Sequence, residues 1–82
     1  MKVQILYFAG LRDAVGLAEE SLVLPAAVRT VGDLCSHLER RHIAYAERRA
    51  HVRVARNEEF ASDDDALREG DVLALIPPVA GG

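Results

Sequence analysis

The chain of 82 residues is long enough for one small domain and too short for two. Its 10 basic and 13 acidic residues give a net charge of −3. The basic residues are spread from Lys2 to Arg68, which argues against the basic stripe that nucleic-acid binding requires. Because Cys35 is the only cysteine, no internal disulfide can form, and we expect a cytoplasmic protein.

The first expected strand covers residues 2–9, where β-branched and aromatic residues are frequent. Apolar side chains occur at both odd and even positions, which favours a place in the interior of a sheet. The run is too short for a signal peptide or a membrane span, so no membrane partner is expected. Residues 10–16 then predict a short helical turn, which Gly16 closes in the left-handed conformation.

The clearest helix is expected over residues 31–42, after a second strand at 19–25. Thr30 is a good N-cap, and Asp33 follows three residues later, as in a capping box. An apolar stripe at helical spacing should face the sheet and consists of Val31, Leu34, Cys35 and Leu38. The next stretch, 41–51, is rich in Arg and Ala and is either a loop anchored by Ile43 and Tyr45 or a frayed continuation of the helix.

The rest of the domain predicts a hairpin, a polar loop and a final strand. Residues 51–61 alternate inward valines with an outward arginine, and Asn57 is the residue that accepts positive φ at the turn. Leu67 is the only large apolar residue of the loop 62–71, so it should cover the edge of the core. With a last strand at 72–76, this order predicts an α+β fold: a mixed sheet of four to five strands with one main helix packed across one face.

Metal-binding and nucleophilic sites have little support. His37, His42 and His51 share no spacing with Cys35, so we expect solvated histidines and a small buried thiol. The acidic run 63–65 lacks the alternating ligands of a calcium loop and is expected to be solvated. No metal site is predicted.

The C-terminal segment differs from an ordinary frayed terminus. The domain should end at residue 76, after which Pro77 and Pro78 stop the sheet and stiffen an extended tail, 77–82. Val79 and Ala80 are apolar where a solvated tail favours polar residues. Fully extended, the tail reaches roughly 20 Å, enough to enter a partner's active site.

The last two residues suggest what such a tail does. Gly81 and Gly82 have no Cβ atom, so the terminal carboxylate can enter a narrow channel with both faces of its carbonyl open to attack. A carboxylate is a poor electrophile until it is activated. A partner that uses ATP could form an acyl adenylate, from which a sulfur or amine nucleophile displaces AMP.

The element order resembles the ubiquitin-like β-grasp, and a β-grasp domain that ends in Gly-Gly resembles the prokaryotic sulfur carriers. Within these, three stretches are similar to the small subunits of molybdopterin synthase at the same relative positions. They are YFAGLRDAVG (7–16), NEEF (57–60) and EGDVLALIPPVAGG (69–82). The resemblance covers the whole chain, and the ending Pro-Pro-Val-x-Gly-Gly is its most specific part.

The resemblance implies a reaction sequence. An activating enzyme related to the ubiquitin-activating enzymes would adenylate Gly82 with ATP, and a sulfur donor protein would convert it to a thiocarboxylate. Within a heterotetramer with the large synthase subunit, the sulfur would pass to cyclic pyranopterin monophosphate and form the molybdopterin dithiolene. The chain itself would bind no cofactor.

The resemblance also assigns residues. Gly82 would be the sulfur-bearing terminus. The residues inserted into a partner would be Gly81, Ala80, Val79, Pro78 and Pro77. A partner-binding patch beside the tail would contain Ile76, Phe60 and Phe8, although core packing is an equal alternative for Phe8. The stretch 41–51 matches no pattern of this family.

Three other functions fit the same ending. The chain could carry sulfur for thiamine or cysteine biosynthesis, act as a ubiquitin-like modifier conjugated through Gly82, or serve as an interaction module with an inert tail. Mass spectrometry separates the first two classes, because a carrier exchanges one oxygen for sulfur at Gly82 and a modifier forms isopeptide-linked ladders.

Overall fold

A five-stranded mixed sheet is the framework of the structure, a computed structural model that describes residues 1–78. Its strands are β1 (Lys2–Tyr7), β2 (Glu19–Val23), β3 (Arg53–Arg56), β4 (Glu59–Phe60) and β5 (Val72–Ile76). They lie in the order β2-β1-β5-β3-β4. β1 and β5 pair in parallel, and all other neighbours are antiparallel. The interior place predicted for the first strand is confirmed.

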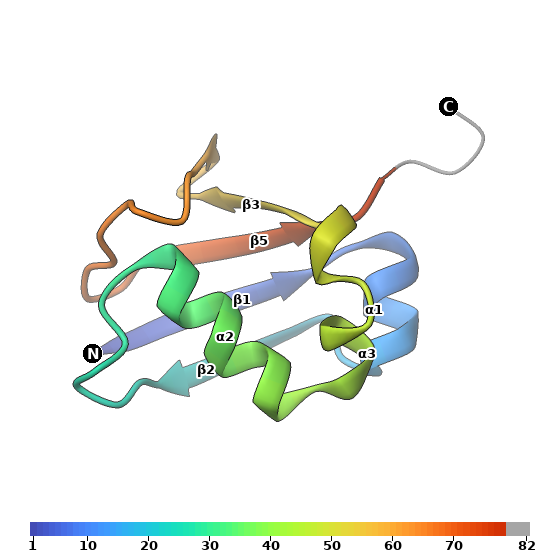
Figure 1. Cartoon of the computed structure of the whole chain (residues 1–82), viewed down its shortest axis with the longest axis horizontal. Helices are drawn as coiled ribbons and strands as arrows, with labels where there is room; N and C mark the ends of the chain where they lie inside the picture. Colours follow the sequence, from blue (N-terminus) through green and yellow to red (C-terminus); the bar gives the residue numbers. More distant parts are fainter. Residues whose placement is uncertain (79–82) are drawn as a thin grey trace.

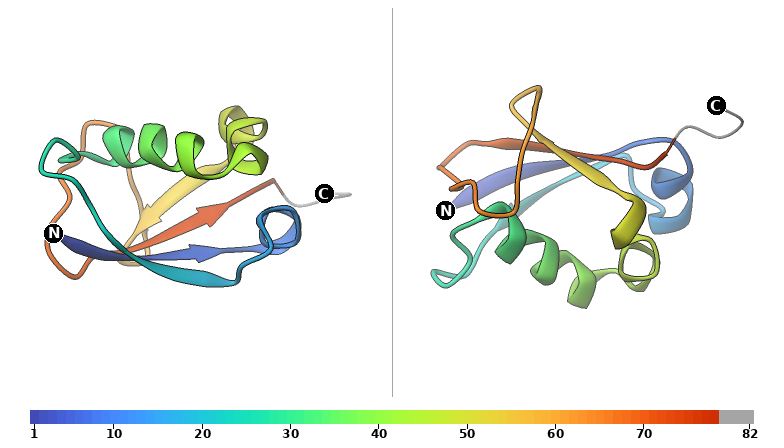
Figure 2. Two further views of the ribbon diagram at one scale, coloured as in Figure 1. Left: turned by 90° about the horizontal axis from the view of Figure 1, so that it is seen from below. Right: turned by 45° about the horizontal axis from the view of Figure 1, so that its top comes forward.

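The helices cover one face and one end of this sheet (Figure 1). They are α1 (Ala9–Val15), α2 (Val31–Arg41), α3 (Ile43–Ala46) and a 3₁₀ turn, η1 (Arg49–His51). α2 crosses one face of the sheet, as the side view in Figure 2 shows. The predicted α+β architecture with one main helix is therefore confirmed. No helix among residues 1–78 is long and apolar enough to cross a membrane.

The core lies between α2 and the sheet. It is built from the odd-numbered residues of β1, the alternate residues of its neighbours and the predicted stripe of α2, together with one residue each of α1 and α3. Its most buried members are Val3, Ile5, Leu11, Val31, Leu34, Leu38, Tyr45, Leu73 and Leu75. Cys35 and Leu67 are buried here, as predicted. The alternation along the strands and the helical spacing along α2 thus place the apolar side chains in one buried layer.

The segment after α2 matches neither of the two structures expected for it, a loop or a frayed continuation of the helix. α3 and η1 form separate short turns, so the chain is helical in part but does not continue α2. Tyr45 is fully buried and anchors the segment, whereas Ile43 is 77% exposed. The predicted anchoring role of Ile43 is wrong, because in this short helix only one of the two side chains faces the core.

The start of α2 is fixed by the predicted capping box. The Thr30 hydroxyl accepts a hydrogen bond from the backbone of Asp33, and the Asp33 carboxylate accepts from the Thr30 and Arg29 backbones. These backbone hydrogen bonds lower the pKa of Asp33. A local pattern of four residues therefore determines where the main helix begins.

The turn between β3 and β4 is a two-residue hairpin with positive φ at both central residues. Asn57 has φ 51°, as predicted, and Glu58 has φ 72°. The Asn57 side chain also donates to Asp71 at 2.9 Å and accepts from the Val72 backbone at 2.9 Å. The turn is thereby attached to the start of β5, which holds the hairpin in register.

The partly buried carboxylate of Glu20 ties the edge strand β2 to the end of α2. Glu20 accepts hydrogen bonds from Tyr7 at 2.6 Å, His42 Nε2 at 2.7 Å and Arg41 Nε at 3.0 Å. Burial alone would raise the pKa of Glu20, but these hydrogen bonds outweigh it and lower the pKa. The expectation of a solvated His42 is wrong, because its ring lies half-buried between this carboxylate and the edge of Tyr7.

Replacing Glu58 by glycine should stabilise the protein by about 1 kcal/mol. Glycine adopts the left-handed conformation without the steric penalty of a Cβ atom, and the Glu58 side chain is exposed. Urea unfolding measures the change. The matched control is Glu59→Gly in β4, which should destabilise by about 0.5–1 kcal/mol because glycine weakens a strand. Equal losses of stability in Glu58→Gly and Glu59→Gly would contradict the left-handed conformation of Glu58 in this turn.

Replacing Glu20 by glutamine should destabilise the protein by about 1–3 kcal/mol at neutral pH, since glutamine keeps the size of the side chain but not its charged acceptors. The folded-state pKa of Glu20 lies below its ordinary value of 4.5. The stabilisation is therefore complete above pH 4.5 and is lost as the pH falls through the folded-state value.

The free energy of unfolding of the variant and of the unmodified protein, measured at decreasing pH, tests this expectation. The difference between the two free energies should shrink as the pH falls. Glu19→Gln is the control, because Glu19 is exposed and, among the residues described, its side chain accepts a hydrogen bond only from Gln4. If the difference in unfolding free energy stays constant down to about pH 3, the ionised Glu20 carboxylate is not the source of the stabilisation.

Candidate functional site

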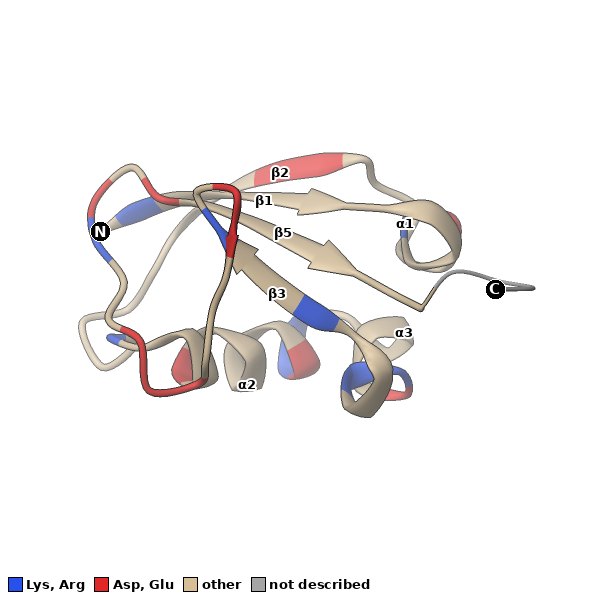
Figure 3. Ribbon diagram, turned by 90° about the horizontal axis from the view of Figure 1, so that it is seen from above, with Lys and Arg blue, Asp and Glu red and all other residues tan. Residues whose placement is uncertain are grey.

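The face of the sheet opposite α2 carries a row of apolar side chains. Leu6 of β1 pairs with Ala74 of β5, Ala74 pairs with Ala55 of β3, and Ala55 pairs with Phe60 of β4. Paired residues share a face, so this row crosses four strands. β5 has no charged residue, and β1 has one, Lys2, at its start (Figure 3). We call this surface the open face.

Phe60 ends the row and is held by an arginine. Its ring is 57% exposed, and the guanidinium carbon of Arg53 lies 3.6 Å from the ring centroid, in the geometry of a cation–π contact. Arg53 pairs with Ile76 in the ladder between β3 and β5. The sequence-predicted patch residues Phe60 and Ile76 are therefore linked through Arg53 across the open face.

A groove of about 600 Å³ lies where the chain leaves the sheet. Its walls include Phe8 from the end of β1 and Ile76, Pro77 and Pro78 from the end of β5. Phe8 is 45% exposed, so it belongs to the surface and the alternative of core packing is wrong. Ala9 follows with φ 49°, a left-handed conformation that turns the chain sharply from β1 into α1 beside the groove.

A second hollow, of about 450 Å³, connects this groove to the hairpin. Leu6, Phe8, Val72 and Ala74 line it together with the turn residues at 57–58. Because Phe8 borders both hollows, the apolar surface runs from the hairpin to the base of the C-terminal segment. Exposed apolar surface of this kind is typical of protein–protein contacts.

The structure thus brings Phe8 and Ile76 together and places Phe60 at the far side of the same face. Gly82, Gly81, Ala80 and Val79 lie outside the described residues, so their predicted roles stay predictions. Leu6, Ala55, Ala74 and Arg53 were missed by the sequence reasoning. The apolar even positions of residues 2–9 were a signal for Leu6, whereas the Arg53–Phe60 contact depends on the register of the hairpin.

The described side chains offer a binding surface rather than a reacting group. Among residues 1–78, no three His, Cys, Asp or Glu side chains lie close enough together to hold a metal ion. Burial raises the pKa of the Cys35 thiol, which keeps it protonated and a poor nucleophile. Chemistry at this face would therefore come from the segment that follows Pro78 or from a partner.

Comparisons with known proteins agree with this arrangement. The model of the ThiS family matches residues 5–82. The chain is 33% identical over 84 residues to the molybdopterin synthase sulfur carrier subunit of Chlamydomonas reinhardtii, with 100% of both chains covered. It is 31% identical over 84 residues to the human protein of the same name, covering 99% of this chain and 94% of the relative. The crystal structure of SAMP1 from Haloferax volcanii is similar with a TM-score of 0.88 and 32% identity, covering 100% of each chain.

Proposed function

The chain belongs to the ThiS family and is a ubiquitin-like sulfur carrier, and we propose that it carries sulfur to molybdopterin synthesis on the carboxyl group of Gly82. The observation that supports the proposal most is the open face, which continues into the groove beside Pro77 and Pro78. A partner that covers this face would receive the following residues, Val79–Gly82, directly from it.

The proposed chemistry begins with activation of the carboxylate. In an activating enzyme, a carboxylate oxygen of Gly82 attacks the α-phosphate of ATP, and pyrophosphate leaves. A persulfide of a donor protein then attacks the acyl carbon and displaces AMP, which gives an acyl disulfide. A second thiol attacks the donor's sulfur of this disulfide, so that the thiocarboxylate leaves and the donor is left in a disulfide bond with that thiol. Gly81 and Gly82 suit both steps because no side chain shields the acyl carbon.

The second partner we propose is the large subunit of molybdopterin synthase. Inserted into it, the thiocarboxylate sulfur attacks a carbon of cyclic pyranopterin monophosphate and forms a thioester. Water then cleaves the acyl–sulfur bond, which leaves the sulfur on the pterin and returns the Gly82 carboxylate, and two such transfers complete the dithiolene. Phe8, Phe60 and Ile76 would form the contact with this subunit, in a heterotetramer of two small and two large subunits. The relatives named as sulfur carrier subunits of this synthase support the assignment. A cytoplasmic location fits the supply of ATP.

Adding one residue after Gly82 should abolish sulfur transfer and leave folding intact, because the carboxylate would move beyond the position where activation occurs. The measurement is molybdopterin formation in a mixture of the protein, the activating enzyme, a sulfur donor, the large subunit and the pterin precursor. Circular dichroism checks the fold. Conversion by the extended and untrimmed protein would disprove the role of the terminal carboxylate.

Gly81→Val tests the narrow channel separately. Two methyl groups on the β-carbon should block insertion of the tail, so we expect at least a ~100-fold loss of transfer, on the order of 2.7 kcal/mol. Ala80→Val, one residue earlier, is the comparison and should cost less. Equal activity of Gly81→Val and the unmodified protein would argue against a channel.

Phe60→Ser should weaken binding of the large subunit about tenfold, because an exposed aromatic side chain that becomes buried in an interface commonly contributes more than 1 kcal/mol. The matched control is Val23→Ser. Val23 is 79% exposed on the edge strand β2, far from β4 in the strand order, so its removal should leave affinity unchanged. Isothermal titration calorimetry provides the affinities. An equal loss of affinity in both variants would show that the open face is not part of the interface.

A protein-modifier function is the second candidate, favoured by the similarity to SAMP1, called a small archaeal modifier protein. Both functions use an activated Gly82, but the final nucleophile is sulfur in one and a lysine amine in the other. Mass spectrometry of the protein from its own cells separates them. A mass increase of one oxygen-to-sulfur exchange supports the carrier, and isopeptide-linked products support the modifier.

A further inference from the structure

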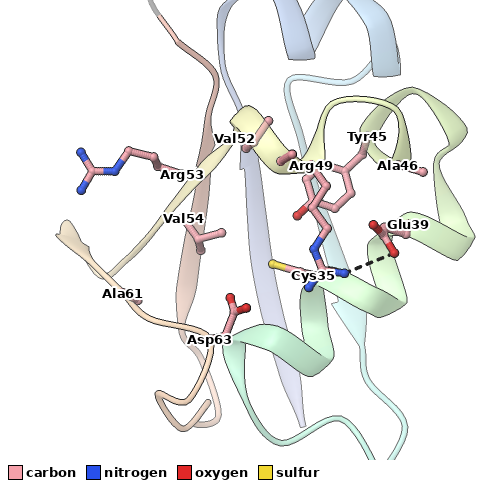
Figure 4. A pocket seen from close by; sticks show the side chains of 11 residues that line it. Cys35, Glu39, Tyr45, Ala46, Arg49, Val52, Arg53, Val54, Ala61 and Asp63 are labelled. Atoms are coloured by element: carbon pink, nitrogen blue, oxygen red, sulfur yellow. Dashed lines mark ion pairs between the residues drawn. The ribbon is translucent and has the colours of Figure 1, made fainter.

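Arg53 is a charged residue in the apolar part of the open face. It pairs with Ile76 in the ladder between β3 and β5, and its guanidinium carbon lies 3.6 Å from the centroid of the Phe60 ring. Figure 4 shows its side chain pointing away from Tyr45 and Cys35, which belong to the helical side of the sheet. Arg53 therefore lies on the same surface as the apolar residues assigned to the contact with a partner.

The other charged residues of β1, β3, β4 and β5 lie elsewhere. Lys2 is at the start of β1, at the end of the open face opposite to the groove. Arg56 pairs with Glu59 and with Leu73, which is fully buried under α2, so this row belongs to the helical side. β5 contributes no charge. Arg53 is thus the only charge that these four strands place at the groove end of the open face.

The guanidinium of Arg53 has no polar partner within the described chain. Among residues 1–78, no carboxylate forms an ion pair with it and no oxygen accepts a hydrogen bond from it. The Phe60 ring attracts the positive charge but offers no oxygen atom. Arginine carries its N–H donors in a planar fork that matches the two oxygens of a carboxylate, and in Arg53 this fork is unused.

A partner that covers the open face has to accommodate this charge. In the free protein the exposed guanidinium of Arg53 is solvated by water, and a partner seated on Phe60 and Ile76 displaces that water. A cation that is removed from water without a counter-charge weakens binding strongly, whereas an ion pair with matching hydrogen bonds offsets the loss. Tight binding here therefore requires a negatively charged acceptor beside Phe60.

We propose that the partner of the open face places an Asp or Glu side chain against Arg53, between its contacts with Phe60 and Ile76. Both carboxylate oxygens accept hydrogen bonds from the guanidinium, which the Phe60 ring holds in position for them. The inference rests on the proposed function, in which the large synthase subunit covers the open face. It adds the chemistry by which that subunit recognises this chain, an apolar surface that contains one carboxylate.

Arg53→Gln should weaken binding of the large subunit about tenfold, because glutamine removes the charge with which the carboxylate pairs. The Arg53 side chain is exposed, so the fold should be unchanged, which circular dichroism checks. Calorimetry of Arg53→Gln in the Phe60→Ser protein should still show a loss of at least about fivefold. If the loss disappears in that background, Arg53 acts only by holding Phe60, and the carboxylate is wrong.

The affinities of the single variants separate this inference from the proposed function. If Phe60→Ser binds more weakly and Arg53→Gln binds normally, the open face is an interface without the proposed carboxylate, and this inference alone fails. If both variants bind normally, the large subunit does not cover the open face, and the inference fails together with the proposed interface.

Arg53→Glu tests the sign of the partner's charge. It should weaken binding about 100-fold at low salt, and the affinity should recover as added salt screens the repulsion between the two carboxylates. Arg40→Glu is the matched control, because it reverses one exposed charge on α2, on the helical side of the sheet, and should change the affinity less than about twofold. Equal effects of the two variants, or tighter binding of Arg53→Glu, would overturn the inference.

A cross-link of zero length identifies the carboxylate. In Arg53→Lys the new side chain keeps a positive charge, and a water-soluble carbodiimide joins its amine to an adjacent carboxylate as an amide and takes up the lost water as a urea. Lys2, the only lysine of the chain, lies at the other end of the open face, so mass spectrometry of peptides distinguishes the two positions. We expect a link from position 53 to an Asp or Glu of the large subunit. Links from Lys2 or the Met1 amine alone would show that no carboxylate faces Arg53.

Discussion

Parallel pairing of β1 with β5 is the constraint on which the candidate site depends. Because the two strands run in the same direction, they end at the same edge of the sheet, with Tyr7 opposite Leu75. The residues that follow, Phe8 and Ile76, are therefore brought together where the chain leaves the sheet. With α2 on one face only, the alternate apolar residues of both strands stay uncovered and form the open face.

Local interactions explain which parts of the fold were predictable. The capping box at Thr30 and Asp33 and the left-handed Asn57 depend on a few consecutive residues, so a single sequence shows them. The environment of His42 was predicted wrongly because its partner, Glu20, is 22 residues away on an edge strand. Contacts of this kind follow from tertiary packing, which no local pattern contains.

The candidate site was predicted mainly by resemblance. Phe8, Phe60 and Ile76 were assigned from the family, while the alternation along the strands indicates only which residues share a face. To combine these faces into one surface, the strand order must be known, and β1 and β5 are separated by more than 60 residues of sequence. The Arg53 contact with Phe60 required in addition the register of the hairpin.

The segment 41–51 is held to the rest of the fold at three points. At its start the Glu20 carboxylate binds His42 and Arg41, in its middle Tyr45 is buried in the core, and near its end Arg49 pairs with Glu39. These contacts reach an edge strand, the core and α2, so the segment cannot shift as a unit without breaking one of them. The same contacts therefore fix the side of the groove to which Arg48 and His51 contribute, opposite Pro77 and Pro78 at the base of the C-terminal segment.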